Sequence, residues 1–130
     1  MANINSALSQ YNQVAGQVGL DDVDSHRLVQ LLFEGSLNRI AEAKGHMLRG
    51  EIAEKGTRIS KAISIVESLR TSLDKGAGGE IAEHLDNLYE YICKRLLEAN
   101  MTNNPQLLDE AAELLGEVKS AWGTIPEELR

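Results

Sequence analysis

Residues 78–100 read GGEIAEHLDNLYEYICKRLLEAN, and this stretch decides the fold. Two glycines interrupt the preceding segment, and Glu80 and Glu83 then place negative charge in the first turn of a helix, where the helix dipole favours it. At about 100° per residue, one row of apolar side chains forms a single seam: Ile81, Leu85, Leu88, Ile92, Leu96 and Ala99. A second row runs beside it: Ala82, Tyr89, Cys93 and Leu97. The two rows cover roughly half the circumference, so the second row is either core or the lining of a groove for another helix.

Three further segments have the apolar spacing of amphipathic helices, over about residues 24–49, 52–74 and 105–122. Gly50 is expected to end the first of them, and Pro105 is preorganised for the first position of the last. The glycine pair at residues 78–79 is expected to make the turn into the organising helix. Short linkers between long helices imply antiparallel neighbours. The sequence therefore predicts an all-α fold, an antiparallel up-and-down four-helix bundle.

The length of 130 residues suits a single helical-bundle domain over residues 1–130. We expect an N-terminal arm over residues 1–23, the bundle over residues 24–122 and a C-terminal tail over residues 123–130. The arm is rich in Asn, Gln, Ser and Gly, with apolar residues spaced by three and four. Because isolated helices of this length are marginal in water, we expect a mobile or short-helical arm. A disordered terminus without a role fits the same pattern.

The composition argues against several classes of partner. A net charge of −7 and a pI near 4.9 disfavour nucleic acid and membrane surfaces, because phosphate binding needs clustered Lys and Arg. The single cysteine excludes an internal disulfide and a thiolate metal cage, which fits a reducing compartment. The first residues lack the features of a secretory signal, and no run approaches the ~18 apolar residues of a membrane span. We expect a cytoplasmic protein without membrane insertion.

No residue pattern here predicts an enzyme, a cofactor or a metal site. A di-metal bundle needs Glu-x-x-His pairs on facing helices, whereas the two Glu/His pairs of this chain are spaced by four. We interpret these pairs as surface polar residues, and we expect His26 to be a surface or boundary residue. Cys93 lacks a basic neighbour on its own row, which favours a small buried thiol over a nucleophile.

Residues 46–50, HMLRG, resemble the H-x-L-K-G core of histidine phosphotransfer domains, with Arg49 in place of Lys. Those domains are acidic helical bundles that carry an exposed phosphorylatable imidazole beside a basic residue. In that family the glycine lies within the helix, so that a partner can approach the imidazole, whereas Gly50 is expected to terminate the helix here. Phosphotransfer through His46 remains an alternative function.

Four features taken together resemble the flagellar secretion chaperone family FliS. They are Tyr11 in a Gln- and Asn-rich arm, DSHRLVQLLFEGSL over residues 24–37, the whole of residues 78–100, and the late Trp122. The match covers about a hundred residues in the right order. It departs from the family where Ser25 and His26 replace the usual Ser-Pro helix start, and where Phe33 and Glu34 stand for the commoner Tyr-Asp.

The resemblance implies a cytosolic, non-enzymatic chaperone that holds the disordered C-terminal segment of flagellin in hydrophobic grooves. It would prevent premature polymerisation and help deliver flagellin to the type III export apparatus through the gate protein FlhA, and some members also bind an anti-sigma factor. The arm is expected to cover part of the client groove until it is displaced, with Leu8, Tyr11 and Val14 as contacts. The candidate groove residues are Val29, Phe33, Tyr89, Cys93 and Leu97. A generic helical scaffold with another client is the remaining alternative.

Overall fold

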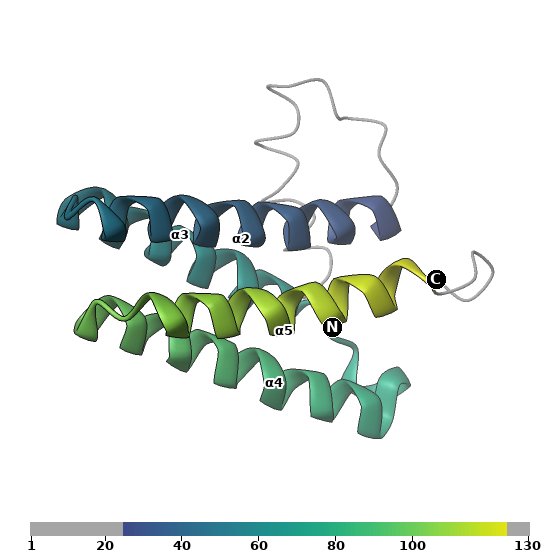
Figure 1. Ribbon diagram of the computed structural model, residues 1–130. Coiled ribbons are helices and arrows are strands. Elements are labelled where there is room, and N and C mark those ends of the chain that lie inside the picture. The colour runs from purple at the N-terminus through teal and green to yellow at the C-terminus, as the bar shows by residue number, and fades with distance from the viewer. Residues whose placement is uncertain (1–24, 125–130) are drawn as a thin grey trace.

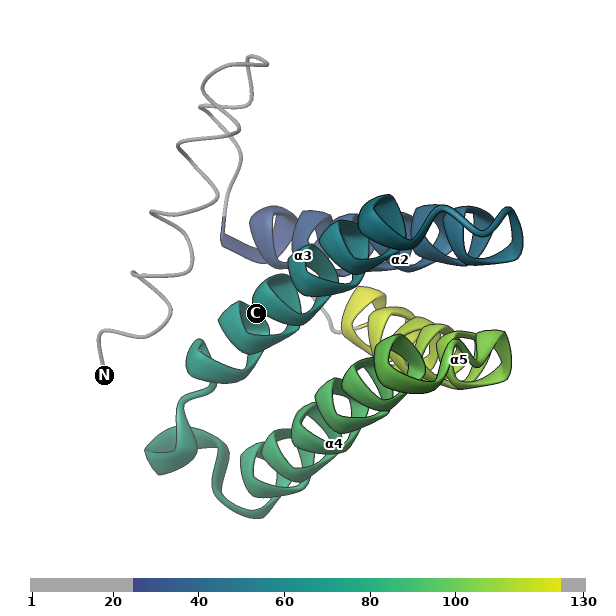
Figure 2. The same ribbon diagram turned by 90° about the vertical axis from the view of Figure 1, so that its left-hand side faces the viewer.

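The structure is a computed structural model that describes residues 25–124, and this part of the chain forms four antiparallel helices (Figure 1). The helices are α2 (Ser25–Leu48), α3 (Ile52–Thr71), α4 (Lys75–Thr102) and α5 (Pro105–Gly123). Both α2 and α4 pack against α3 and α5, and the diagonal pairs do not meet. Figure 2 shows α3 passing between α2 and α4. The predicted all-α, up-and-down four-helix bundle is confirmed for these residues, whereas the predicted arm lies outside them.

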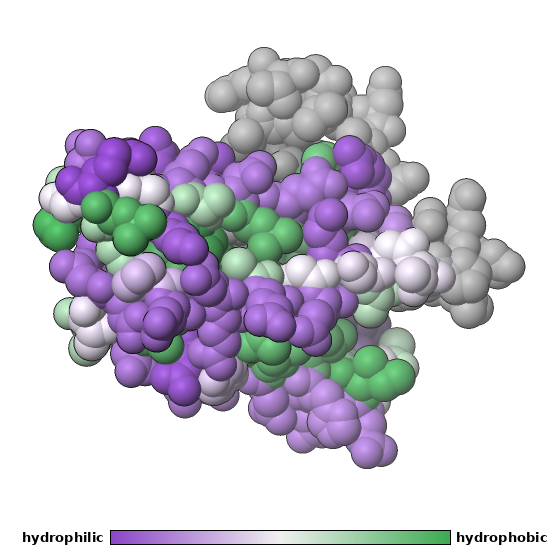
Figure 3. Space-filling view, in the orientation of Figure 1, coloured by the Kyte–Doolittle hydropathy of each residue, from purple (hydrophilic) through white to green (hydrophobic). Residues whose placement is uncertain are grey.

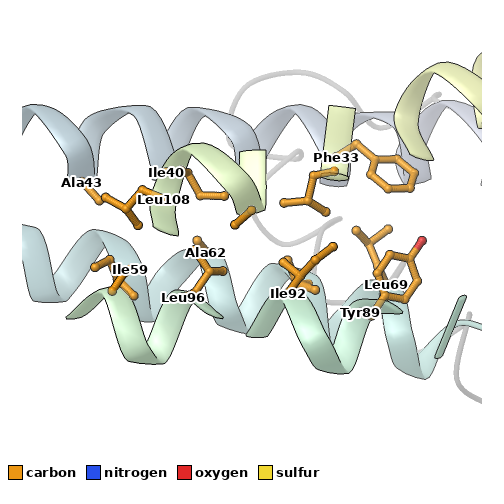
Figure 4. Packing of buried hydrophobic residues seen from close by; sticks show 14 of the residues in the cluster. Phe33, Ile40, Ala43, Ile59, Ala62, Leu69, Tyr89, Ile92, Leu96 and Leu108 are labelled. Carbon is orange, nitrogen blue, oxygen red and sulfur yellow. The ribbon is translucent and has the colours of Figure 1, made fainter. Parts of the chain in front are cut away.

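All four helices contribute apolar side chains to one core (Figure 4). The largest fully buried apolar members are Phe33, Ile59, Leu69, Ile92, Leu96, Leu108, Leu115 and Val66. Burial of each large apolar side chain stabilises the fold by roughly 1.5–3 kcal/mol relative to its exposure. The core therefore supplies the driving force that the amphipathic pattern predicts.

The buried face of α4 draws on both apolar rows of its sequence. Ala82 and Tyr89 come from the second row, while Ile92, Leu96 and Ala99 come from the first. Ile81, expected in the first seam, is instead 72% exposed. The core-facing direction lies between the two rows because α4 packs against α3 and α5 at once. The placement of Ile81 in the first seam is thus wrong, and the start of the second row belongs to the core, one of the two alternatives left open.

The connection between α3 and α4 contains a short helical piece ahead of the predicted glycine turn. α3 ends at Thr71, and α4 begins at Lys75. The side chain of the preceding residue, Asp74, accepts a hydrogen bond from the Ala77 N–H at 3.0 Å. This is an N-cap, and it starts the helix ahead of the glycine pair. Gly79 has φ 54 and ψ −128, a non-helical conformation open to glycine, so it separates this short first piece from the long part of α4. The predicted turn at the glycine pair is therefore present, and the short capped piece before it was not predicted.

The end of α2 follows the sequence closely. Gly50 has φ 76, the Glu51 N–H donates to the His46 carbonyl at 2.8 Å, and the Gly50 N–H donates to the Met47 carbonyl at 3.1 Å. These two bonds make a Schellman motif, which satisfies carbonyls that the last turn leaves free. The predictions that Gly50 ends this helix and that Pro105 opens α5 are confirmed.

His26 and Trp122 join the start of α2 to the end of α5. The His26 ring stacks on the indole at 4.8 Å between centroids, with Nε2 3.1 Å from the Trp122 carbonyl oxygen. The Trp122 indole N–H donates in return to the His26 carbonyl at 3.2 Å. His26 is 9% exposed and its bonds are partly buried, so it is a boundary residue, the second of the two positions expected for it. The partner that covers it lies 96 residues away in the chain, beyond the reach of local sequence patterns.

A charged cluster links the C-terminal half of α3 to α4. The Arg70 guanidinium donates from Nε to Oδ1 of Asp86 at 2.6 Å, and the Lys75 ammonium donates to Oδ2 at 3.1 Å. These bonds, that of Arg70 first, lower the pKa of Asp86 below its usual value, although partial burial opposes the shift. The cluster holds the kinked start of α4 against α3.

The neighbouring residues Leu96 and Leu97 give a matched test of the core. Leu96 is fully buried and Leu97 is 52% exposed, so truncation creates a cavity only at the first. We expect Leu96→Ala to lower the free energy of unfolding by about 2–5 kcal/mol. Leu97→Ala should change it by no more than about 0.5 kcal/mol. Urea denaturation of both variants measures this, and equal losses would contradict the described packing.

The Asp86 cluster predicts a pH dependence of stability. The pKa of the Asp86 carboxyl is lower in the folded state than the value of about 3.9 in the unfolded state, so the ionised carboxylate stabilises the fold above that pH. This stabilisation is lost as the pH falls through the folded-state pKa. We expect Asp86→Asn to lower the free energy of unfolding by up to about 1 kcal/mol near pH 7. The difference from wild type should shrink below about pH 4. Urea titrations across this range measure it, and a constant difference would show that the carboxylate charge is not involved.

Candidate functional site

A groove of about 1050 Å³ runs along the outer side of α3. α2 borders it through Leu32, Gly35 and Arg39, and Asn100 borders it near the end of α4. Along α3 the lining extends from Ile52 to Ser68, which corresponds to about 24 Å of helix. The groove is therefore long enough for about four turns of a partner helix.

Small side chains of α3 keep the groove open. Gly56, Ser60, Ser64 and Ser68 all line it and are spaced by four residues. Residues at this spacing share one face of a helix, so these short side chains form a continuous shallow strip. A second backbone can approach such a strip more closely than it can approach a row of large side chains. The strip belongs to the side of α3 that faces away from the core.

Apolar side chains are also available in and beside the groove. Leu32 and Ile65 line it from α2 and α3, and Ile52 lines it while 54% exposed. Leu97 and Met101 follow one turn apart on α4, next to the groove residue Asn100, and are 52% and 75% exposed. The antiparallel topology brings Ile52, Leu97, Met101 and the exposed Leu48 toward the same end of the bundle, where Figure 3 shows hydrophobic surface.

A buried lysine joins α3 to the end of α4 beside the groove. Lys55 is 3% exposed, and its ammonium donates to the Asn100 carbonyl at 2.9 Å and to Oδ1 of Asn103 at 2.7 Å. Asn103 has φ 53 and forms the C-cap of α4. A cation at this end interacts favourably with the helix dipole. One bond satisfies the Asn100 carbonyl, which the last turn leaves free, and the other holds the Asn103 side chain. Lys55 thus fixes one end of the groove.

The structure places the sequence-predicted contacts in three different settings. Val29, Phe33 and Tyr89 belong to the core, and none of them lies among the residues that line the groove. Cys93 is half-buried, and Leu97 is exposed. The predicted arm contacts Leu8, Tyr11 and Val14 lie outside the described residues. The second apolar row of α4 is therefore core at its start and surface at its end, which answers the question left open by its spacing.

Burial also determines the chemistry of Tyr89 and Cys93. Desolvation raises the pKa of the Tyr89 phenol above its usual value, so the side chain is neutral at ordinary pH. The pKa of the Cys93 thiol is raised to about 12, first by burial and then by the Glu67 carboxylate. Such a thiol is a poor nucleophile. The interpretation of Cys93 as a structural residue therefore agrees with its surroundings.

The structure also bears on the alternative role of His46. Its Nδ1 lies 2.7 Å from Oε1 of Glu51 within the turn that ends α2, and its side chain is only 19% exposed. Arg49 donates from Nε to the same carboxylate oxygen at 3.0 Å, and the two partners, His46 first, lower the pKa of Glu51. The Glu51 pair orients the ring across the helix end. The imidazole is thus paired with a carboxylate of the same chain, and Gly50 ends the helix here, whereas the corresponding glycine of phosphotransfer domains lies within it.

The spacing of hydrophobic residues could not reveal the groove, because most of the α3 residues that line it are small or polar. The available signal was the four-residue recurrence of small residues from Gly56 to Ser68. Within residues 25–124, no group of three His, Cys, Asp or Glu side chains could hold a metal ion. The described helices also include none that is long and apolar enough to span a membrane.

Comparisons with known proteins agree on one family. The family model described as flagellar protein FliS matches residues 7–129. Flagellar secretion chaperone FliSB of Pseudomonas aeruginosa is 51% identical over 119 residues, which cover 92% of this chain and 94% of the relative. The flagellar secretion chaperones FliS of Vibrio cholerae and Salmonella typhimurium are 39% and 36% identical, over 94% and 92% of this chain and 90% of each relative.

The Lys55 junction predicts a specific loss of stability. Lys55→Met keeps most of the aliphatic stem but leaves the oxygens of Asn100 and Asn103 without their donor. We expect the free energy of unfolding to fall by about 1–3 kcal/mol. Lys61→Met, on the exposed face of the same helix, is the control and should change it by less than about 0.5 kcal/mol. Thermal or urea denaturation measures both, and similar losses would show that the two bonds are unimportant.

Proposed function

Because the chain belongs to the flagellar secretion chaperone family FliS, we propose that it binds the C-terminal segment of flagellin in the groove along α3. It would act in the cytosol as a non-enzymatic chaperone, prevent premature polymerisation of flagellin and assist its delivery to the flagellar type III export apparatus. The export gate protein FlhA and an anti-sigma factor are further proposed partners.

The groove is the observation that supports this proposal most directly. An amphipathic helix binds a groove through apolar residues at i, i+3, i+4 and i+7. The strip of small residues on α3 gives such a helix room, and the exposed side chains of Ile52, Leu97 and Met101 offer apolar contacts at one end. Large exposed apolar residues gathered at one place mark interaction surfaces more often than residues scattered singly.

Apolar contact also meets the energetic requirement of a disordered client. A segment that folds on binding loses conformational entropy, and burial of apolar surface must offset that loss. Side chains that already contribute to the core cannot supply this burial again. Leu97 and the half-buried Cys93 can, and we retain both as proposed client contacts.

The remaining predicted contacts enter the proposal differently. Val29, Phe33 and Tyr89 are buried, so a client would reach them only if the bundle opened. We propose that they support the groove from the core side. Leu8, Tyr11 and Val14 stay proposed contacts of an N-terminal arm that covers part of the groove before a client arrives.

A groove-filling substitution tests the proposal. Ser64 is exposed and lines the groove, so the indole of Ser64→Trp would occupy the space of a client helix. We expect the dissociation constant for a peptide of the flagellin C-terminal segment to rise at least about tenfold. Isothermal titration calorimetry measures this constant.

Ser120→Trp is the matched control because Ser120 is also exposed but lies on α5, which does not touch α3. The dissociation constant of the Ser120→Trp variant for the same peptide should stay within about twofold of the wild-type value. A tenfold change would correspond to about 1.4 kcal/mol of binding free energy. Equal effects of the two substitutions would remove the groove as the binding site. A wild-type protein that fails to bind the peptide at high micromolar concentration would contradict the flagellin proposal and favour another client.

A further inference from the structure

The groove differs in charge from the rest of the chain. The chain has a net charge of −7, yet the charged residues lining the groove are Arg39 and Lys61, both cationic. No Asp or Glu belongs to this lining within the described residues. An acidic protein therefore presents positive charge at this groove.

The cations at the groove exceed the carboxylates that could neutralise them. Arg39 lies 2.9 Å from Glu42 through Nε, and Arg58 approaches the same carboxylate oxygen at 3.3 Å. Lys61 follows Arg58 by one turn and has no ion-pair partner among residues 25–124. Two guanidinium groups thus share the Glu42 carboxylate at the seam between α2 and α3, and Lys61 adds a third cation without an ion pair among the described residues. Lys55, whose partners are amide oxygens, adds a buried positive charge farther along α3.

A partner with a complementary charge would relieve this imbalance. Charges near apolar surface interact more strongly than charges in bulk water, because the local dielectric constant is lower. Bringing a carboxylate to an uncompensated cation is favourable there, whereas a basic segment would be repelled. Complementary charge chiefly sets specificity and the rate of encounter, while apolar contact supplies affinity.

We propose that the groove selects a helical client segment that carries an Asp or Glu side chain facing Lys61 and Arg39. Lys61 lies nine residues from Ile52 and seven from Ser68, near the middle of the groove. The client carboxylate would sit about 13 Å along the helix from the apolar contacts at Ile52. This inference rests on the proposed function, since the client is the flagellin C-terminal segment, and it adds the charge and register of the bound helix.

Charge reversal at the groove tests the inference. Lys61→Glu changes the charge by the same amount as Lys119→Glu on α5, a helix that does not touch α3. Neither lysine has an ion-pair partner among the described residues. The probe is a peptide of the flagellin C-terminal segment from the same organism, and a second peptide has its Asp and Glu replaced by Asn and Gln. Circular dichroism checks that both variants remain folded.

At low salt we expect Lys61→Glu to weaken binding of the native peptide on the order of tenfold, and Lys119→Glu by less than about twofold. The difference in affinity between the two lysine variants should become smaller as the NaCl concentration rises from about 0.05 M to about 0.5 M, because salt screens exposed charges. Wild type should bind the neutralised peptide more weakly than the native peptide. The neutralised peptide should bind Lys61→Glu as tightly as it binds wild type, or more tightly.

The outcomes separate this inference from the proposed function. If wild type binds the native peptide and the two lysine variants lose affinity equally, the charge selection is overturned while the flagellin proposal stands. The same holds if the neutralised peptide binds as well as the native one. If wild type binds neither peptide at high micromolar concentration, the proposed function falls and the inference falls with it.

Discussion

The burial of one face of α4 against both α3 and α5 is the constraint on which the rest of the structure depends. Tyr89, Ile92 and Leu96 fill the space between these two helices, and α2 closes the ring from the opposite side. Because each helix packs only against its two neighbours, α3 keeps a side that no described helix covers. The groove follows from this arrangement and from the small residues that α3 places on that side.

Local patterns predicted what local physics controls. The spacing of apolar residues gave the four helices and most of the core, and Gly50 and Pro105 marked helix ends by backbone preferences that act within a turn. Patterns were insufficient where distant residues decide the outcome. His26 is covered by Trp122, which lies 96 residues away in the chain. The Asp74 cap is by contrast a local bond to Ala77, which hydrophobic spacing alone does not show. The direction of the α4 core face depends on two neighbours at once, which one helical wheel cannot show.

The candidate site was harder to predict than the fold because its lining lacks a hydrophobic signature. The second apolar row of α4 led to the prediction of contacts on that helix, and of these only Leu97 is well exposed. The hydroxyl side chains of α3 leave open space, and space is a property of neighbouring helices together. The excess of cations around Glu42 likewise appears only after α2 and α3 are brought side by side. Surface chemistry of this kind depends on tertiary structure.

Trp122 has a consequence for observing this molecule in solution. It is the single tryptophan of the chain, and its indole is stacked and hydrogen-bonded at the junction of α2 and α5. Tryptophan fluorescence, excited selectively over that of the three tyrosines, therefore comes from one known position. A change in its wavelength or intensity reports whether that end of the bundle is closed. Changes at the opposite end of the bundle, near Lys55, do not directly alter the fluorescence of Trp122. The protein thus carries a built-in optical probe that distinguishes loosening at one end from events at the other.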